Sequence, residues 1–154
     1  MQTTTFKGTT VNLSGNVINV GNKAPTVTAI GTDLSDVEIG GAKDKIQLLI
    51  TVPSLDTDTC AAETRRLNQD VNNLGICETT VVSMDLPFAS ARFCSTAGIA
   101  HLTVTSDYLD KEVSQAYGVL MTDGKLKGLS ARTIFVIDRG GHVVYQECGE
   151  DVRA

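Results

Sequence analysis

The chain contains no hydrophobic run long enough to cross a membrane and no N-terminal targeting signal. Its longest apolar stretches, Leu48 to Val52 and Thr133 to Ile137, are far shorter than the ~20 residues that a membrane-spanning helix needs. The N-terminus, Met1 to Thr5, has neither the positive region nor the apolar region of a secretory signal. We therefore expect no insertion into a bilayer, and we expect the protein in the cytoplasm, a reducing compartment.

Basic clusters and metal-binding spacings are absent as well. The 13 basic and 18 acidic residues give a net charge of 13 − 18 = −5, and no stretch gathers Lys and Arg into a patch that would release counterions from phosphates. We therefore expect no nucleic-acid partner. The four cysteines are separated by 17, 17 and 54 positions, so none forms the C-x-x-C pair typical of zinc sites. His101 and His142 have no ligand-like neighbours, and we expect no metal.

The chain does have enough residues for one independent core. Its 154 residues, 42% of them apolar, can bury roughly 68–70% of the surface that the unfolded chain exposes. Such a core needs no disulfide or metal to hold it together, which leaves the four cysteines available for chemistry. There is no internal repeat, low-complexity tract or linker, so we predict a single domain over residues 1–154.

Hydrophobic patterns predict an alternation of strands and helices. The mostly apolar run from Ile46 to Val52 is typical of a buried central strand, and Pro53 ends it because proline cannot donate a ladder hydrogen bond. Thr57 to Asn72 carries small and apolar side chains at three- and four-residue steps, which predicts a helix. The other predicted extended elements are an N-terminal hairpin around Gly8, short extended segments between Val20 and Gly41, strands at Thr79–Met84 and Leu102–Thr105, and a hairpin of Arg132–Ile137 with Val143–Cys148. Two further helices are predicted at Pro87–Thr96 and Asp107–Tyr117, and the second is expected to be capped by Ser106 or Asp107. Together they predict an α/β fold, with a mixed central β-sheet flanked by helices and an N-terminal β-hairpin.

Cys60 lies in the first turn of the helix predicted after this central strand. The N–H groups at a helix N-terminus favour negative charge, so we expect the thiolate of Cys60 to be stabilised. Thr57 lies three residues earlier on the same helix face, where its hydroxyl is able to donate a hydrogen bond to the sulfur or to an oxygen beside it. The alternative is a buried structural cysteine, because free cysteine often serves as a small apolar residue. Position alone leaves both interpretations open.

The residues around Cys60 resemble a known family. Pro53, Thr57 and Cys60 match the Pro-x-x-x-Thr-x-x-Cys motif of the peroxiredoxins. Further blocks, in the family's order, narrow the resemblance to the bacterial thiol peroxidases, the atypical 2-Cys peroxiredoxin subfamily: Ser83–Ala89, Arg92–Cys94, Tyr117–Val119 and Gly128–Arg132. The resemblance covers most of the chain and implies a thioredoxin-like fold. Members of the subfamily continue into a C-terminal helix, whereas this chain ends at Ala154, so we expect the domain without that helix.

The resemblance also implies roles for individual residues. Cys60 would be the peroxidatic nucleophile, and Thr57 and Arg132 would complete its pocket, with Pro53 shielding the site. Cys94 would be the resolving cysteine, which captures the Cys60 sulfenic acid in an intramolecular disulfide before a second oxidation. Without the resemblance, Arg132 would be read as a surface arginine on a strand, Pro53 as a strand terminator, and Cys94 as an inert helix cysteine.

The implied activity is that of a thioredoxin-dependent peroxidase. Its substrates would be hydrogen peroxide and organic hydroperoxides, it would need no cofactor, and it would work as a homodimer. The apolar residues Leu55, Phe88 and Phe93 would favour alkyl peroxides if they line the entrance. A non-enzymatic alternative is a peroxide-sensing redox switch or binding module that uses the same cysteine pair, and a third is a scaffold without activity.

The remaining residues of interest have two interpretations each. Cys77 and Cys148 match no motif of the family, and we expect them to be free thiols or packing residues. Asp85 and Arg92 belong to the matched blocks. They either shape the pocket or form a surface pair seven residues apart in the chain.

Overall fold

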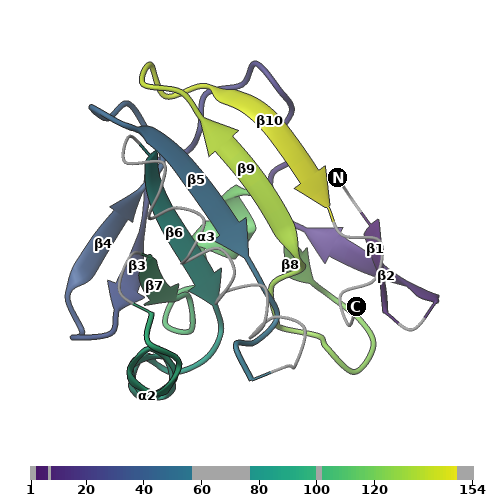
Figure 1. Cartoon of the computed structure of the whole chain (residues 1–154). Helices are drawn as coiled ribbons and strands as arrows, with labels where there is room; N and C mark the ends of the chain where they lie inside the picture. Colours follow the sequence, from purple (N-terminus) through teal and green to yellow (C-terminus); the bar gives the residue numbers. More distant parts are fainter. Residues whose placement is uncertain (1–2, 7, 57–76, 100–101, 149–154) are drawn as a thin grey trace.

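The computed structural model describes residues 3–6, 8–56, 77–99 and 102–148. Figure 1 labels the strands and helices of these ranges. In chain order they are β1 (Thr3–Phe6), β2 (Thr9–Ser14), β3 (Val27–Gly31), β4 (Asp36–Ile39), β5 (Ile46–Thr51), β6 (Cys77–Ser83), α2 (Pro87–Ala97), β7 (Thr103–Ser106), α3 (Glu112–Ala116), β8 (Leu120–Met121), β9 (Thr133–Ile137) and β10 (Val143–Cys148). The helix predicted at Thr57–Asn72 lies outside the described residues.

Seven strands form the central sheet, in the order β10-β9-β5-β6-β7-β3-β4 (Figure 1). β5 pairs in parallel with β6, and β6 pairs in parallel with β7. The other neighbours in the sheet pair antiparallel. The mixed sheet predicted from the sequence is therefore confirmed, and β5, the apolar run that Pro53 follows, lies in its middle, as expected of a strand that is buried on both faces.

Side chains alternate between the two faces of this sheet and build two separate cores. In β5, Leu49 belongs to one core and Ile50 to the other, and in β6 Val82 and Val81 divide in the same way. This is the two-residue period of an extended strand. The α3 helix packs on the first core and α2 on the second, so the two helices cover opposite faces of the sheet (Figure 1).

A smaller sheet, β1-β2-β8, lies beside the central one. β1 and β2 are antiparallel, and Gly8 between them has a φ of 80°, a conformation that glycine adopts without steric cost. Val11 of β2 and Met121 of β8 are buried in the first core. The N-terminal hairpin predicted from the sequence is confirmed, and the structure adds β8 to it.

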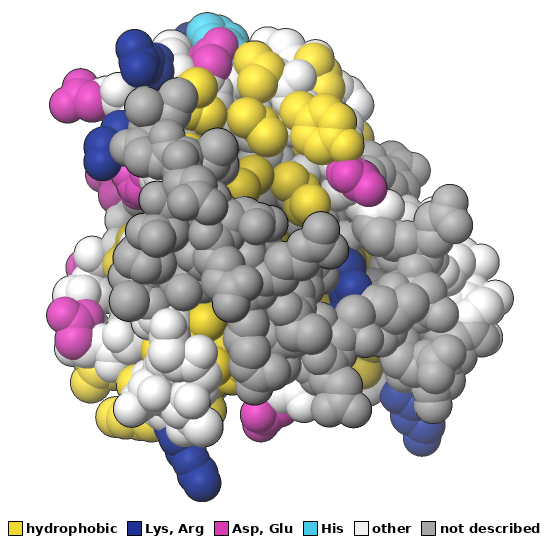
Figure 2. Space-filling model, in the orientation of Figure 1, with side chains coloured by type: hydrophobic (Ala, Val, Ile, Leu, Met, Phe, Trp, Pro, Cys, Tyr) yellow, Lys and Arg dark blue, Asp and Glu magenta, His cyan; other side chains and the backbone are white. Residues whose placement is uncertain are grey.

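Two further hairpins form the edges of the central sheet. β9 and β10 are antiparallel, with a register shift between Val143 and Tyr145, which confirms the predicted C-terminal hairpin. At the opposite edge, β3 and β4 pair antiparallel within the region where short extended segments were predicted. Hydrophobic side chains remain visible at the β10 side of the sheet (Figure 2), where Val144 and Tyr145 are 49% and 48% exposed.

The helix predicted at Asp107–Tyr117 is wrong in its extent, because α3 covers Glu112–Ala116 alone. Lys111 has a φ of 52°, a left-handed conformation that prevents the helix from beginning earlier. The N-cap residue is Lys111 and not Ser106 or Asp107, but the Asp107 carboxylate still caps N–H groups of the helix: it accepts hydrogen bonds from the N–H groups of Val113 at 3.1 Å and Ser114 at 2.8 Å. A turn separates this cap from the helix that it serves.

The α2 helix, by contrast, matches its prediction to within one residue. It has 11 residues and begins at Pro87, a residue suited to a first helical turn, where its missing N–H costs nothing. It ends at Gly98, which is left-handed with a φ of 70°, as is common after a helix. Among the described parts of the chain, no helix is both long and apolar enough to span a membrane.

Candidate active site

Several residues that the sequence marks as functional meet at one end of the central sheet. β5 and β6 are parallel, with Thr51 beside Val82, so the segments that follow both strands leave the sheet at the same end. The N–H of Val52 still donates to the carbonyl of Val82 at 2.9 Å. Pairing then stops at Pro53, which has no N–H and is buried. Pro53 therefore ends the strand and is buried at this end of the sheet. This position is compatible with both interpretations of Pro53, a residue that shields the site and a strand terminator.

β9 brings Arg132 to the same end of the sheet. Because β5 and β9 are antiparallel with Thr51 opposite Thr133, Arg132 and Pro53 lie just beyond the same end of this strand pair. The Thr51 hydroxyl donates to the carbonyl of Ala131 at 2.7 Å and contacts the hydroxyl of Thr133. Arg132 is half-buried, and its Nε is shielded from solvent.

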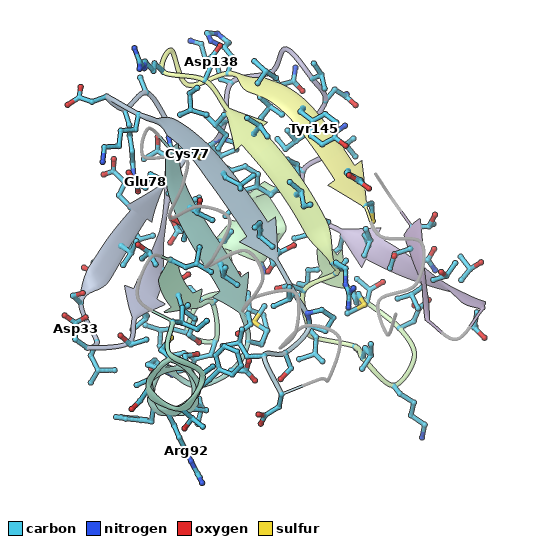
Figure 3. The ribbon with its side chains drawn as sticks, in the orientation of Figure 1. Asp33, Cys77, Glu78, Arg92, Asp138 and Tyr145 are labelled. Atoms are coloured by element: carbon cyan, nitrogen blue, oxygen red, sulfur yellow. The ribbon has the colours of Figure 1, made fainter. Side chains whose placement is uncertain are left out.

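A carboxylate ties the segment after β5 to the segment after β6. Asp85 Oδ1 accepts a hydrogen bond from Ser54 Oγ at 2.7 Å. Its Oδ2 accepts from the N–H of Leu55 at 2.7 Å and from Ser83 Oγ at 2.9 Å. Arg92 is exposed and points away from the sheet, outward from α2 (Figure 3). Asp85 therefore shapes the loops at this end of the sheet. The alternative, a surface pair of Asp85 with Arg92, is wrong.

Cys94 lies in the last turn of α2 and faces the sheet. It packs against the second core, which includes Val52 and Leu55. Its carbonyl accepts the capping N–H of Gly98 and, at 2.9 Å, the N–H of Ile99. The thiol is free and half-buried, and burial raises the pKa of Cys94 because the thiolate loses its hydration. Held in this way, the thiol is a weak nucleophile.

Cys60 and Thr57 lie outside the described residues, so their roles stay predictions. The structure does place the residues that lead into them, since Leu55 and its hydrogen bond to Asp85 belong to the described part of the chain. Within the described ranges, no group of three or more His, Cys, Asp and Glu side chains is able to hold a metal ion.

The other two cysteines lie at opposite ends of the central sheet, because Cys148 pairs with Thr133 beside Arg132 whereas Cys77 begins β6. Cys77 is at the opposite end of β6 (Figure 3), next to Glu78, whose Oε1 is 3.1 Å from Lys43 Nζ. Cys148 ends β10 opposite Thr133, and burial raises the pKa of its thiol as well. Neither position contradicts the expectation that these cysteines are packing residues.

The predicted apolar entrance is wrong for Leu55. This side chain is 2% exposed and belongs to the second core, so it cannot line an opening to solvent. Phe93 packs against the same core, whereas Phe88 is 70% exposed. The three residues therefore do not form one apolar surface that would select alkyl peroxides.

The partners that organise this end of the sheet were not predicted from the sequence. The buried Thr51 and Thr133 are polar residues at the ends of two mostly apolar strands, and each lies within two positions of a candidate site residue. Asp85 was predicted to shape the pocket or to pair with Arg92, but its partners were not predicted, although Ser83 and Asp85 form a Ser-x-Asp pattern directly after a buried strand. Polar side chains at strand ends were the available signal in both cases.

Comparison with known proteins agrees with this arrangement. The Redoxin family profile matches residues 19–154. The thiol peroxidase of Campylobacter jejuni is 49% identical over 152 residues, which are 99% of this chain and 86% of that protein. The thiol peroxidase of Aquifex aeolicus is 44% identical over 144 residues, which are 94% of this chain and 85% of that protein.

Solved structures show the same relationship. A peroxiredoxin-like protein from Aquifex aeolicus superposes with a TM-score of 0.97 at 42% identity, covering 100% of this chain and 90% of that one. A thiol peroxidase from Chromobacterium violaceum has a TM-score of 0.88 at 19% identity, covering 99% and 88% of the two chains, and this similarity speaks for the fold alone. The thioredoxin-like fold is thereby confirmed. The chain belongs to the thiol peroxidase family of the peroxiredoxins and is a peroxiredoxin-type peroxidase.

Proposed function

We propose that this enzyme reduces hydrogen peroxide and organic hydroperoxides through Cys60, with Cys94 as the resolving cysteine and thioredoxin as the reductant. The observation that carries the proposal is the position of the Cys94 thiol. It packs on the same core as Leu55, and Leu55 precedes Cys60 by five residues in the sequence. The helix that carries the second cysteine thus packs beside the segment that leads to the first.

The first chemical step transfers one peroxide oxygen to Cys60. The thiolate attacks an oxygen, a sulfur–oxygen bond forms, the oxygen–oxygen bond breaks, and the departing oxygen takes a proton and leaves as water or an alcohol. Arg132 brings a permanent positive charge to this end of the sheet, and this charge favours the thiolate. Its guanidinium N–H groups also donate hydrogen bonds to the departing oxygen. In the proposed pocket Thr57 donates a further hydrogen bond, and the buried Pro53 excludes water.

The second step joins the two cysteines. The sulfur of Cys94 attacks the sulfur of the Cys60 sulfenic acid, a disulfide forms, the sulfur–oxygen bond breaks, and the oxygen leaves as water. A disulfide requires the two Cα atoms to lie within about 7 Å, and Cys94 is held in a capped helical turn by Gly98 and Ile99. Unwinding of this last turn of α2 releases Cys94, and local opening at a helix end needs less free energy than global unfolding.

Recycling completes the proposed cycle. The dithiol of thioredoxin supplies two electrons, reduces the disulfide and becomes a disulfide itself. This chemistry places the enzyme in the cytoplasm, where thiols are kept reduced. A homodimer as the working form belongs to the same proposal, supported by exposed apolar side chains at the start of α2, where Leu86 is 53% exposed and Phe88 is 70% exposed.

The test of the proposed cycle is to map the disulfide. The reduced protein receives one equivalent of peroxide, its thiols are blocked at quench, and intact and peptide masses are measured. We expect a loss of two hydrogens that maps to a link between Cys60 and Cys94, and steady peroxide consumption when thioredoxin and its reductase are added. A link to Cys77 or Cys148, or a reduced Cys60, would contradict the proposal. A single oxidation without turnover would favour the redox switch.

The pH dependence of Cys94 gives a second prediction. Because burial raises the pKa of this thiol in the folded chain, its thiolate should appear at higher pH than in the unfolded chain, where the ordinary value is about 8.5. The rate of iodoacetamide alkylation at Cys94, mapped by mass in a Cys60→Ser background, should have a higher midpoint pH in buffer than in urea. Equal midpoints in the two conditions would show that burial does not control this thiol.

A further inference from the structure

We propose that Asp85 is a positioning residue for disulfide formation, because it joins the segment that leads into Cys60 to the segment that leads into the helix carrying Cys94. The inference rests on the two-cysteine cycle proposed above and deepens it. In that cycle the Cys60 sulfenic acid has two fates, capture by Cys94 or a second oxidation to the sulfinic acid. Asp85 shifts this competition towards capture.

The hydrogen bonds of Asp85 span both segments. Ser54 and Leu55 follow β5, and they donate to different oxygens of the carboxylate, each at 2.7 Å. Ser83 ends β6 and donates to Oδ2 at 2.9 Å. Asp85 itself lies two residues before Pro87, the first residue of α2. One carboxylate therefore links the bases of the two segments that the cycle must bring together.

This link is rigid. Ser83 is fully buried and Leu55 is 2% exposed, so the donors are fixed by packing as well as by hydrogen bonds. Bonds to an ionised carboxylate are roughly twice as strong as bonds between neutral groups. The N–H of Asp85 also donates back to Ser83 Oγ at 3.2 Å, which holds the carboxylate in its orientation.

The link and the opening lie at opposite ends of α2. Asp85 precedes the first turn of the helix, whereas Cys94 lies in the last turn, next to the cap at Gly98. Unwinding of the last turn therefore leaves the Asp85 hydrogen bonds intact. With the base of α2 fixed, the released thiol explores a smaller volume, and its effective concentration at the sulfenic acid is higher.

Two substitutions at this position separate the link from the charge. Asp85→Ala removes the two carboxylate oxygens that accept hydrogen bonds from Ser54, Leu55 and Ser83. Asp85→Asn keeps one carbonyl oxygen, and its amide donates to the Ser54 hydroxyl, which already accepts the N–H of Asp56 at 3.1 Å. The asparagine variant is therefore the conservative one and should retain the link.

The measurement is the competition between the two oxidation products. Each full-length variant is oxidised over a range of peroxide concentrations, and mass spectrometry gives the fractions of Cys60–Cys94 disulfide and Cys60 sulfinic acid. In Asp85→Ala the peroxide concentration that yields equal amounts of disulfide and sulfinic acid should fall about tenfold. This factor corresponds to the loss of a hydrogen bond to a charged group. The rate of disulfide formation after rapid mixing should fall by the same factor. Asp85→Asn should stay within about threefold of the parent.

Asp107 offers a matched control. Its carboxylate also follows a strand and accepts two backbone N–H groups, those of Val113 and Ser114. However, it serves α3, which packs on the opposite face of the sheet from α2. Asp107→Ala should therefore lower the thermal midpoint without changing the competition between disulfide and sulfinic acid.

The outcomes are distinguishable. If Asp85→Ala loses stability as Asp107→Ala does but keeps the parent's product ratio, Asp85 is structural and the inference is wrong. If Asp85→Ala does not fold, Ser54→Ala decides: it removes one of the three donors, so the same ratio should shift about threefold in the same direction, and an unchanged ratio overturns the inference. If the parent itself forms no Cys60–Cys94 disulfide, the proposed cycle fails instead.

Discussion

Replacing Cys60 with serine should abolish peroxide reduction, with the rate falling to the background reaction, a loss of about 10⁶-fold on the scale of ordinary enzymatic acceleration. The reacting species is a thiolate, which is a strong nucleophile and forms a sulfenic acid. A serine hydroxyl is not ionised near neutral pH, and it has no equivalent oxidation product. The measurement is peroxide consumption by the reduced variant, with and without thioredoxin and its reductase.

Two other cysteines provide matched controls for this result. Cys77→Ser and Cys148→Ser make the same atomic change at the far end of β6 and at the end of β10. Both variants should keep the parent's rate, because neither thiol takes part in the proposed cycle. Activity in Cys60→Ser, or its loss in Cys77→Ser, would show that the nucleophile has been assigned to the wrong residue.

Replacing Cys94 with serine should separate the first oxidation from turnover. The variant should consume a first equivalent of peroxide at the parent's rate, which forms the Cys60 sulfenic acid, and a second equivalent more slowly, which forms the sulfinic acid. Its steady-state rate with thioredoxin should fall about 100-fold, because an intramolecular thiol is replaced by reductants from solution. Cys60 should accumulate as the sulfinic acid, since nothing captures the sulfenic acid in time. A burst of peroxide consumption, followed by peptide mass analysis, measures both effects.

Cys148→Ser is the closest control for this variant. Both Cys94 and Cys148 are half-buried, and burial raises the pKa of each thiol. The substitution removes a half-buried thiol in both variants, but the loss of turnover should follow from Cys94→Ser alone. Normal recycling of Cys94→Ser by thioredoxin would remove its assignment as the resolving cysteine.

The strands β5, β6, β7, β9 and β10 were predicted from the sequence to within about two residues at either end, whereas β8 was not predicted and β3 and β4 were predicted only as short extended segments. The apolar runs that become β5 and β9 reflect the burial of these strands, because buried positions select apolar side chains. Pro53 ends β5 for an equally local reason, the missing N–H. The α2 helix was also predictable, because proline at its start and glycine after its end are local signals.

The start of α3 was not predictable in the same way. Asp107 looked like a cap directly before a helix, but Lys111 adopts a left-handed conformation and the helix begins only afterwards. The carboxylate reaches Val113 and Ser114 across an intervening turn. Nothing in the residue pattern marks Lys111 for this conformation, because a lysine adopts the left-handed region only rarely.

For the active site, local sequence is sufficient to recognise the family and to nominate Cys60, because the motif residues lie close together in the chain and their chemistry depends on residue type. The contacts that organise the site depend on the packed fold. Asp85 meets Ser54 and Leu55 across 31 and 30 positions of chain, and Thr51 meets Ala131 across 80. Such pairs form because β5 lies between β6 and β9, and strand order depends on contacts between distant segments that no local pattern of residues contains.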